Sequence, residues 1–203
     1  MKALDPDTTT YAAVLESLQT YLAVFIHNIA YYFNVYPADA FQQVRQYNTA
    51  VWLCRAPIVN EYIDEASQKC VDLLKEGKCS AMAISIHDTA AKHVASIPIK
   101  FSLPVVPESD QTVPVTDAPT LIEDLQIEFN AFFTRLANYG PNFNPSNLEH
   151  TFKIQCELEG SHAMEDWISS RAPSSKRLPG LEDTVVRKIE TGPIEVVSWL
   201  EYV

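Results

Sequence analysis

The sequence YPADAFQQVRQYNTAVWLCRAPIVNEYI, residues 36–63, contains the signals around which the rest of the chain is arranged. Pro37 cannot continue a helix and biases the residue before it toward an extended backbone, so it predicts the end of the apolar segment that precedes it. Pro57 predicts a helix start, because proline is tolerated in the first helical turn. Between the prolines, Val51–Leu53 is a β-prone run. The stretch predicts a helix exit, a fixed loop, a short strand and a second helix.

The segment before this stretch predicts one long helix. Apolar residues recur every three or four positions from Tyr11 to Phe33, after capping candidates at Asp7–Thr10. The apolar face is wide, which predicts a helix that runs through the centre of the protein.

The segment after the stretch predicts a helix and two strands. The helix runs from Pro57 to about Lys75, and Gly77 follows it as a left-handed cap residue. Alternating apolar residues then predict strands over Met82–Ile86 and Ile97–Phe101, joined as a hairpin. Pro98 predicts that the second of these strands lies at a sheet edge or contains a bulge.

The second half of the chain predicts a further helix and three strands. In order, the sequence predicts a proline-rich loop over 103–119, a helix over 121–136, a strand over 151–158, a polar irregular segment over 159–180, and strands over 183–190 and 194–202. No internal repeat is visible. With 203 residues, the chain fits a single α+β domain, three helices on an antiparallel sheet.

Composition excludes several classes of function. The net charge of -11 argues against a surface that grips nucleic acid directly, since phosphates are neutralised by clustered Lys and Arg. The first residues, MKALDPDTTT, do not resemble a secretory signal. The apolar run Tyr21–Phe33 is too short to span a bilayer. A soluble protein inside the cell, with no membrane partner, is the expectation.

A search for catalytic or metal-binding motifs finds few candidates. The four cysteines, Cys54, Cys70, Cys79 and Cys156, have spacings that match no zinc or CxxC pattern, so no metal and no cofactor are predicted. An enzyme with Cys54 or Cys156 as its nucleophile is an alternative, although no base can be named for it.

The histidines and the basic residues have simple interpretations. His27 is interpreted as a core or border histidine of the first helix, and His87, His93, His150 and His162 as solvent-exposed residues. The basic pair Lys176-Arg177 is interpreted as a solvated surface, with a patch for an acidic partner or a phosphate as the alternative.

The opening stretch also resembles the HORMA-domain accessory subunits of DNA polymerase zeta. The residues that carry the resemblance are Tyr36, Pro37, Phe41, Tyr47, Asn48, Pro57, Asn60, Tyr62 and Ile63. The resemblance implies a single HORMA domain over residues 1–203, with a core over 1–158 and a C-terminal safety belt and hairpin over 159–203. In this fold the belt wraps around an extended peptide that adds to the sheet.

The resemblance also implies the residues that contact the peptide. Tyr62 matches a tyrosine that packs against a proline of the catalytic subunit's binding motif, and Trp167-Ile168 resembles the Trp-Ile pair of the belt. Tyr36 is expected beside them. Without the resemblance, Tyr62 would be interpreted as an ordinary core aromatic.

Further contacts implied by the resemblance are less well matched. The final hairpin resembles a surface for a second translesion polymerase, represented here by Val185, Ser198 and Leu200, although animal members carry Gln and Tyr at the last two positions. Asn130 stands where those members have an arginine that supports dimerisation between HORMA domains, so any dimer here is expected to be weak or to use other contacts.

The expected function is therefore that of a non-catalytic adaptor. It captures a proline-containing peptide of the polymerase zeta catalytic subunit, supports translesion DNA synthesis and acts in the nucleus. The alternative within the same fold is a spindle-checkpoint or meiotic adaptor with a different partner.

Overall fold

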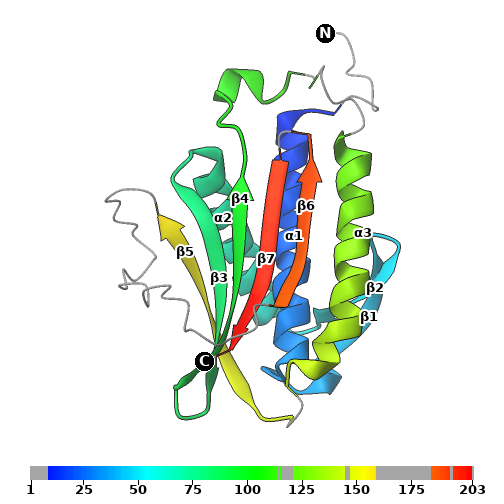
Figure 1. The fold of residues 1–203 in the computed structure, drawn as a ribbon, viewed down its shortest axis with the longest axis vertical. Coiled ribbons are helices and arrows are strands. Elements are labelled where there is room, and N and C mark those ends of the chain that lie inside the picture. Colours follow the sequence, from blue (N-terminus) through cyan, green and yellow to red (C-terminus); the bar gives the residue numbers. More distant parts are fainter. Residues whose placement is uncertain are drawn as a thin grey trace.

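The computed structural model describes residues 9–113, 115, 121–144, 147–158, 184–192 and 194–202. Three α-helices and seven strands follow one another in these ranges (Figure 1). They are α1 (Tyr11–Tyr32), β1 (Phe41–Gln46), β2 (Thr49–Cys54), α2 (Pro57–Lys75), β3 (Cys79–Asp88), β4 (His93–Ser102), α3 (Leu121–Tyr139), β5 (His150–Leu158), β6 (Thr184–Thr191) and β7 (Ile194–Tyr202).

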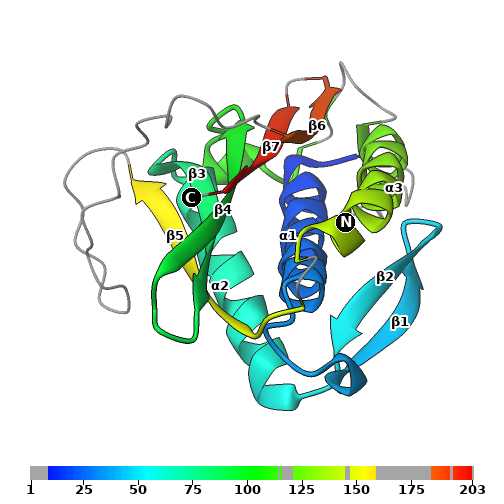
Figure 2. The ribbon, with the colours of Figure 1, turned by 60° about the horizontal axis from the view of Figure 1, so that its bottom comes forward.

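Five of the strands form one antiparallel sheet in the order β5-β3-β4-β7-β6. The three helices cover one face of this sheet, and the β1–β2 hairpin lies on the far side of α1 (Figure 2). Along β4 and β7 every second residue is buried, which is the pattern of a sheet with one face against a core. The predicted α+β architecture is confirmed.

Helix α1 forms the centre of the core. Its N-cap is Thr10, whose side-chain oxygen accepts a hydrogen bond from the backbone N–H of Ala13 at 3.2 Å. From Leu22 to Ala30 every residue except Ala23 is buried. The buried residues include two polar ones, His27 and Asn28. This second half of the helix is buried nearly all round because α2, α3, β2 and the large sheet surround it (Figure 2).

The segment predicted as a fixed loop and a short strand is in fact a hairpin. β1 pairs with β2 from Phe41 opposite Cys54 to Gln46 opposite Thr49. Tyr47 and Asn48 form the two-residue turn, with φ angles of 50° and 56°, the left-handed values of a type I′ turn. The first strand was missed because Phe41–Gln46 contains three glutamines and an arginine among its six residues, a composition with little β propensity.

The prediction that Pro98 marks an edge strand or a bulge was wrong. β4 lies at the centre of the sheet, and Pro98 stands opposite Ala83 of β3 in a regular register. On the other side the pairing of β4 with β7 omits Ile97 and Pro98, and it resumes in the same register at Ile99. The sheet tolerates the missing N–H by interrupting one ladder locally, without a bulge.

The remaining predicted elements are confirmed to within a few residues. α2 starts at Pro57 and is followed by Gly77, whose φ is 65°. α3 spans the predicted apolar stripe, and β5, β6 and β7 lie where the alternation of apolar residues placed them. In the described ranges, no helix combines the length and the apolar character that a membrane span requires.

His150 is a correction among the histidines. It was expected to be exposed, but only 6% of it is accessible, and its Nδ1 lies 2.8 Å from the carbonyl oxygen of Phe33. The contact fixes the first residue of β5 to the end of α1. His87 and His93 are half-buried neighbours across the β3–β4 hairpin, and His162 lies outside the described residues.

His27 is buried, as predicted, and has a consequence for stability. It is 5% exposed, and its Nδ1 accepts a hydrogen bond from the backbone N–H of Cys54 at 3.4 Å. Burial lowers the pKa of His27 from 6.5 to about 4. Between these two values the unfolded chain binds a proton that the folded chain does not, so this histidine destabilises the fold progressively as the pH falls from 6.5 to 4.

Replacing His27 with asparagine is expected to reduce this loss, because asparagine keeps an acceptor near Cys54 but does not titrate. Between pH 7 and about pH 4.5, the free energy of unfolding should fall by about 2–3 kcal/mol less in the variant than in the wild type. Urea denaturation at the two pH values measures the difference. An unchanged pH dependence would show that protonation of His27 is not coupled to folding.

Candidate functional site

The outer edge of β5 is the first feature of the candidate site. In the described part of the chain, β5 pairs with β3 alone and forms one border of the large sheet (Figure 1). The N–H and C=O groups on the other side of β5 therefore have no strand partner among these residues. An edge of this kind can accept an added strand.

An aromatic patch, consisting of Tyr36, Tyr62 and Phe152, lies beside this edge. Tyr62 on α2 contacts Phe152 on β5, with ring centroids 5.9 Å apart in an edge-to-face arrangement. Tyr36, after the end of α1, contacts the same Phe152 ring at 6.5 Å. Phe41 contacts Tyr36, with ring centroids 6.5 Å apart, and is itself buried. The patch thus joins α2 to β5 and has a rigid base.

The patch is accessible on the α2 side. Tyr62 is 47% exposed and Ile58, one turn earlier on the same helix face, is 80% exposed. The interpretation of Tyr62 as a core aromatic is therefore wrong. Two large apolar side chains exposed on one helix face, next to an open strand edge, are typical of a surface that is covered by a partner.

The two tyrosines of the patch are neutral hydrogen-bond donors at physiological pH. Burial raises the pKa of Tyr62, and the proximity of Tyr36 raises it further. The pKa of Tyr36 is raised mainly by burial as well. Each ring therefore combines a large apolar face with a phenol that stays protonated, the combination that makes tyrosine frequent at binding surfaces.

The structure brings together two of the four predicted peptide-binding residues. Tyr36 and Tyr62 are far apart in the sequence and share Phe152 as a neighbour. Phe152 itself was predicted only as a strand residue; its position opposite Tyr62 depends on how α2 packs on the sheet, which the sequence does not show. Trp167 and Ile168 lie outside the described residues, as do Lys176 and Arg177.

The residues predicted for a second partner surface have a different environment from the one expected. Ser198 and Leu200 are 1% and 3% exposed, because both point from β7 toward the helices. A surface contact through these two side chains is not compatible with this burial. Val185 is opposite Trp199 on the neighbouring strand.

The other face of β7 carries the accessible side chains, including Trp199. The Trp199 Nε1–H donates a hydrogen bond to Glu201 at 2.6 Å, and the Lys100 ammonium lies 5.7 Å from its ring centroid. Trp199 lies between Ser198 and Leu200, and neighbouring residues of a strand point to opposite faces of the sheet. The predicted surface residues are therefore one position away from the accessible face.

Asn130, at the position where the resemblance implies an arginine in animal members, makes a contact within this domain. Its side-chain amide donates a hydrogen bond to the carbonyl oxygen of Tyr47 in the β1–β2 turn. This bond ties α3 to the hairpin. It gives Asn130 a role within the domain, and the predicted weak dimer remains a prediction.

The two cysteines considered as nucleophiles differ in access. Cys54 is 2% exposed, so a substrate cannot reach its sulfur without local unfolding. Cys156 is half-buried and lies beside Cys70 and Cys79. The described residues therefore do not add support for the alternative of a thiol enzyme, which needs an accessible nucleophilic thiol with a general base beside it.

The sequence was compared with protein families and with known proteins. No protein-family model matches the chain. The chain is 26% identical over 193 residues to the DNA polymerase zeta processivity subunit of Schizosaccharomyces pombe, and the match covers 89% of each chain.

Solved structures show the fold. One chain of the mitotic checkpoint complex matches with a TM-score of 0.76 and 15% identity, over 94% of this chain and 99% of that one. HTP-2 of C. elegans bound to HTP-3 closure motif 1 matches with a TM-score of 0.70 and 10% identity, over 99% of this chain and 96% of that one. At these identities the likeness concerns the arrangement of the elements.

Proposed function

We propose that this chain, which has the HORMA fold and resembles the accessory subunit of DNA polymerase zeta, is a non-catalytic adaptor that captures an extended peptide. The observation that carries the proposal is the open edge of β5 beside the aromatic patch. The peptide class is a proline-containing segment of the polymerase zeta catalytic subunit. The name of the Schizosaccharomyces pombe relative supports this partner, and the motif bound to HTP-2 in a structure of the same fold supports peptide capture.

The binding mode follows from the geometry of a sheet edge. A peptide in an extended conformation adds beside β5 and forms main-chain hydrogen bonds with it. Its side chains alternate in direction, so every second one points toward the aromatic patch. A proline ring on that side packs against Tyr62, since the tyrosine ring offers a flat apolar face and proline loses little conformational entropy on binding.

The segment after β5 supplies a second wall in this proposal. Trp167 and Ile168 belong to the safety belt, which crosses over the peptide and slows its release. The surface charge is consistent with an indirect link to DNA: a chain with a net charge of -11 reaches a damaged template through its polymerase partner. Action in translesion synthesis in the nucleus is part of the same proposal.

Titration with a synthetic peptide tests the proposal. The full chain is titrated with a peptide from the proline-containing region of the catalytic subunit, with fluorescence anisotropy as the measurement. Two matched peptides serve as controls. One has alanine in place of the prolines; the other carries N-methyl groups that block its main-chain hydrogen bonds at alternate positions. Saturable binding that both changes weaken supports the proposal. Failure of the unmodified peptide to bind would contradict it.

A second candidate is an adaptor for a spindle-checkpoint or meiotic partner. The similarity to a chain of the mitotic checkpoint complex favours it, because the fold is shared over nearly the whole of both chains. A competition experiment distinguishes the two candidates. The chain is loaded with labelled polymerase peptide, and unlabelled polymerase peptide or a closure-motif peptide is added. Displacement by the closure-motif peptide at the lower concentration would favour the second candidate.

A further inference from the structure

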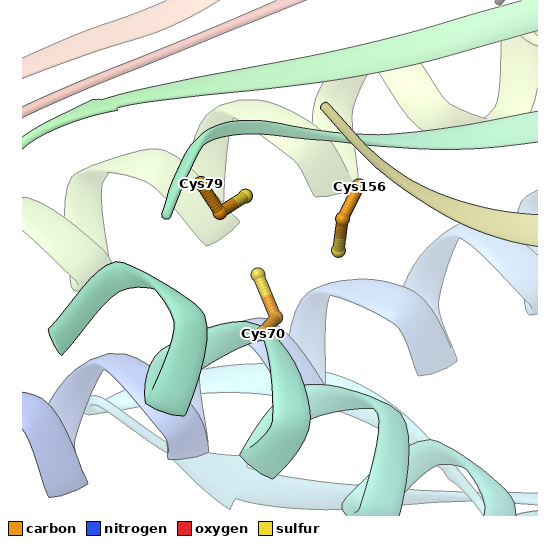
Figure 3. A group of neighbouring side chains, drawn as sticks. All are labelled: Cys70, Cys79 and Cys156. Carbon is orange, nitrogen blue, oxygen red and sulfur yellow. The ribbon is translucent and has the colours of Figure 1, made fainter. Parts of the chain in front are cut away.

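Three of the four cysteines meet between α2 and the sheet, although they come from separate parts of the sequence. Cys70 is on α2, Cys79 begins β3, and Cys156 is on β5. The three sulfur atoms all lie within 4.8 Å of one another and point into the same space (Figure 3). Cys70 and Cys79 are buried, and Cys156 is half-buried at the border of the sheet. We call these three residues the thiol cluster.

The packing of α2 on the sheet creates this arrangement. Cys70 is 0% exposed in the middle of the face that α2 turns toward the core. Cys79 faces it from the start of β3, where the register of β3 with β5 shifts between Cys79 and Ala81. Cys156 is opposite Met82 in the same pair of strands. The sequence could not show the cluster, because its members come from three separate elements and follow no ligand spacing.

We propose that the thiol cluster binds one soft, thiophilic cation of the d10 class that includes Zn(II) and Cu(I). Such ions bond to cysteine sulfur at about 2.3 Å. Three sulfurs around one ion in a plane would then stand about 4 Å apart. The observed limit of 4.8 Å requires only a small inward movement of the side chains.

The environment of the cluster also suits a cation. A site made only of sulfur favours soft ions over Mg(II) or Ca(II), which prefer oxygen. The half-buried position of Cys156 provides the route by which an ion, and a water as a fourth ligand where the ion needs one, enters from solvent.

Binding would connect α2, β3 and β5 by three metal–sulfur bonds. Two of these elements carry Tyr62 (α2) and Phe152 (β5), so the ion would fix the spacing between α2 and the edge strand on which the aromatic patch is built. This inference does not depend on the proposed peptide, since it concerns the chain alone.

Cadmium binding tests the site directly. The full chain, purified with a chelator and kept reduced with a phosphine, is titrated with Cd(II), and sulfur-to-metal charge-transfer absorption is recorded. We expect saturation at one equivalent and three sulfur ligands by X-ray absorption spectroscopy. Cu(I) should displace Cd(II), and Cd(II) should in turn displace Zn(II) from the zinc-loaded chain, because the softer ion binds thiolate sulfur more tightly. At a Zn(II) concentration 100 times its Kd, the melting temperature should rise by about 5–10 °C.

Single substitutions provide the controls. Cys70→Ser, Cys79→Ser and Cys156→Ser should each weaken the absorption, whereas Cys54→Ser, at a buried cysteine outside the cluster, should leave it unchanged. The X-ray absorption measurement on the wild type needs no variant, so it decides the result if a variant does not fold. Fewer than three sulfur ligands, a band lost in Cys54→Ser, or binding without saturation would overturn the proposal. So would oxidation in air to a disulfide within the cluster together with no metal uptake by the reduced chain.

Discussion

Replacing Tyr62 with alanine is expected to weaken binding of the polymerase zeta peptide by about 2 kcal/mol, or roughly 30-fold in Kd. The exposed ring loses its contact with the peptide proline, and the edge-to-face contact with Phe152 goes with it. The stability of the domain should change little, because Tyr62 is 47% exposed. Fluorescence anisotropy gives the affinity, and urea denaturation gives the stability.

Tyr139→Ala is the matched control for this variant. Tyr139 is 45% exposed at the end of α3, which lies beyond α1 from the edge of β5 (Figure 2). Its replacement should leave the affinity unchanged. Tyr62→Phe should keep most of the affinity if the flat ring carries the contact. Equal affinities for the wild type and Tyr62→Ala would remove Tyr62 from the binding site.

Replacing Phe129 with alanine is expected to cost about 3–5 kcal/mol of folding free energy. Phe129 is 0% exposed on α3, and its ring stacks on Tyr21 at 4.4 Å and meets Tyr47 edge-on at 5.3 Å. The variant would lose this buried area and leave a cavity between α1 and α3. The loss is large against the usual stability of a domain, so part of the variant is expected to be unfolded at 37 °C.

Urea denaturation of Phe129→Ala against Ile127→Ala measures this effect. Ile127 lies two residues earlier on the same helix, but it is 64% exposed, so its replacement should change the stability by about 0.5 kcal/mol or less. A loss below about 1 kcal/mol for Phe129→Ala would show that the core relaxes around the missing ring.

The sequence was sufficient to predict the elements whose pattern is local. The prolines at 37 and 57 and the spacing of apolar residues place α1 and α2 correctly, because caps, proline geometry and helical periodicity act over a few residues. The final hairpin was predicted for the same reason. β1 was missed because its residues have polar side chains and its stability comes from pairing with β2.

The order of strands and the site depend on contacts between distant residues. Pro98 was assigned to an edge by a rule about single strands, yet β4 became central when β7 paired with its other side. Tyr62 was assigned to the site through a resemblance, and only the packing of α2 shows that Phe152 supports it. The thiol cluster likewise exists only once α2, β3 and β5 are assembled.

The enclosure of α1 also affects how the protein is made. On the ribosome α1 is synthesised before every element that covers it, and the last strand to cover the core, β7, ends at Tyr202. Throughout that interval the nascent chain carries the long apolar face of α1 without the elements that cover it. We expect newly made chains to occupy chaperones until their last strands emerge, and truncations that remove β6 and β7 to be degraded or to aggregate.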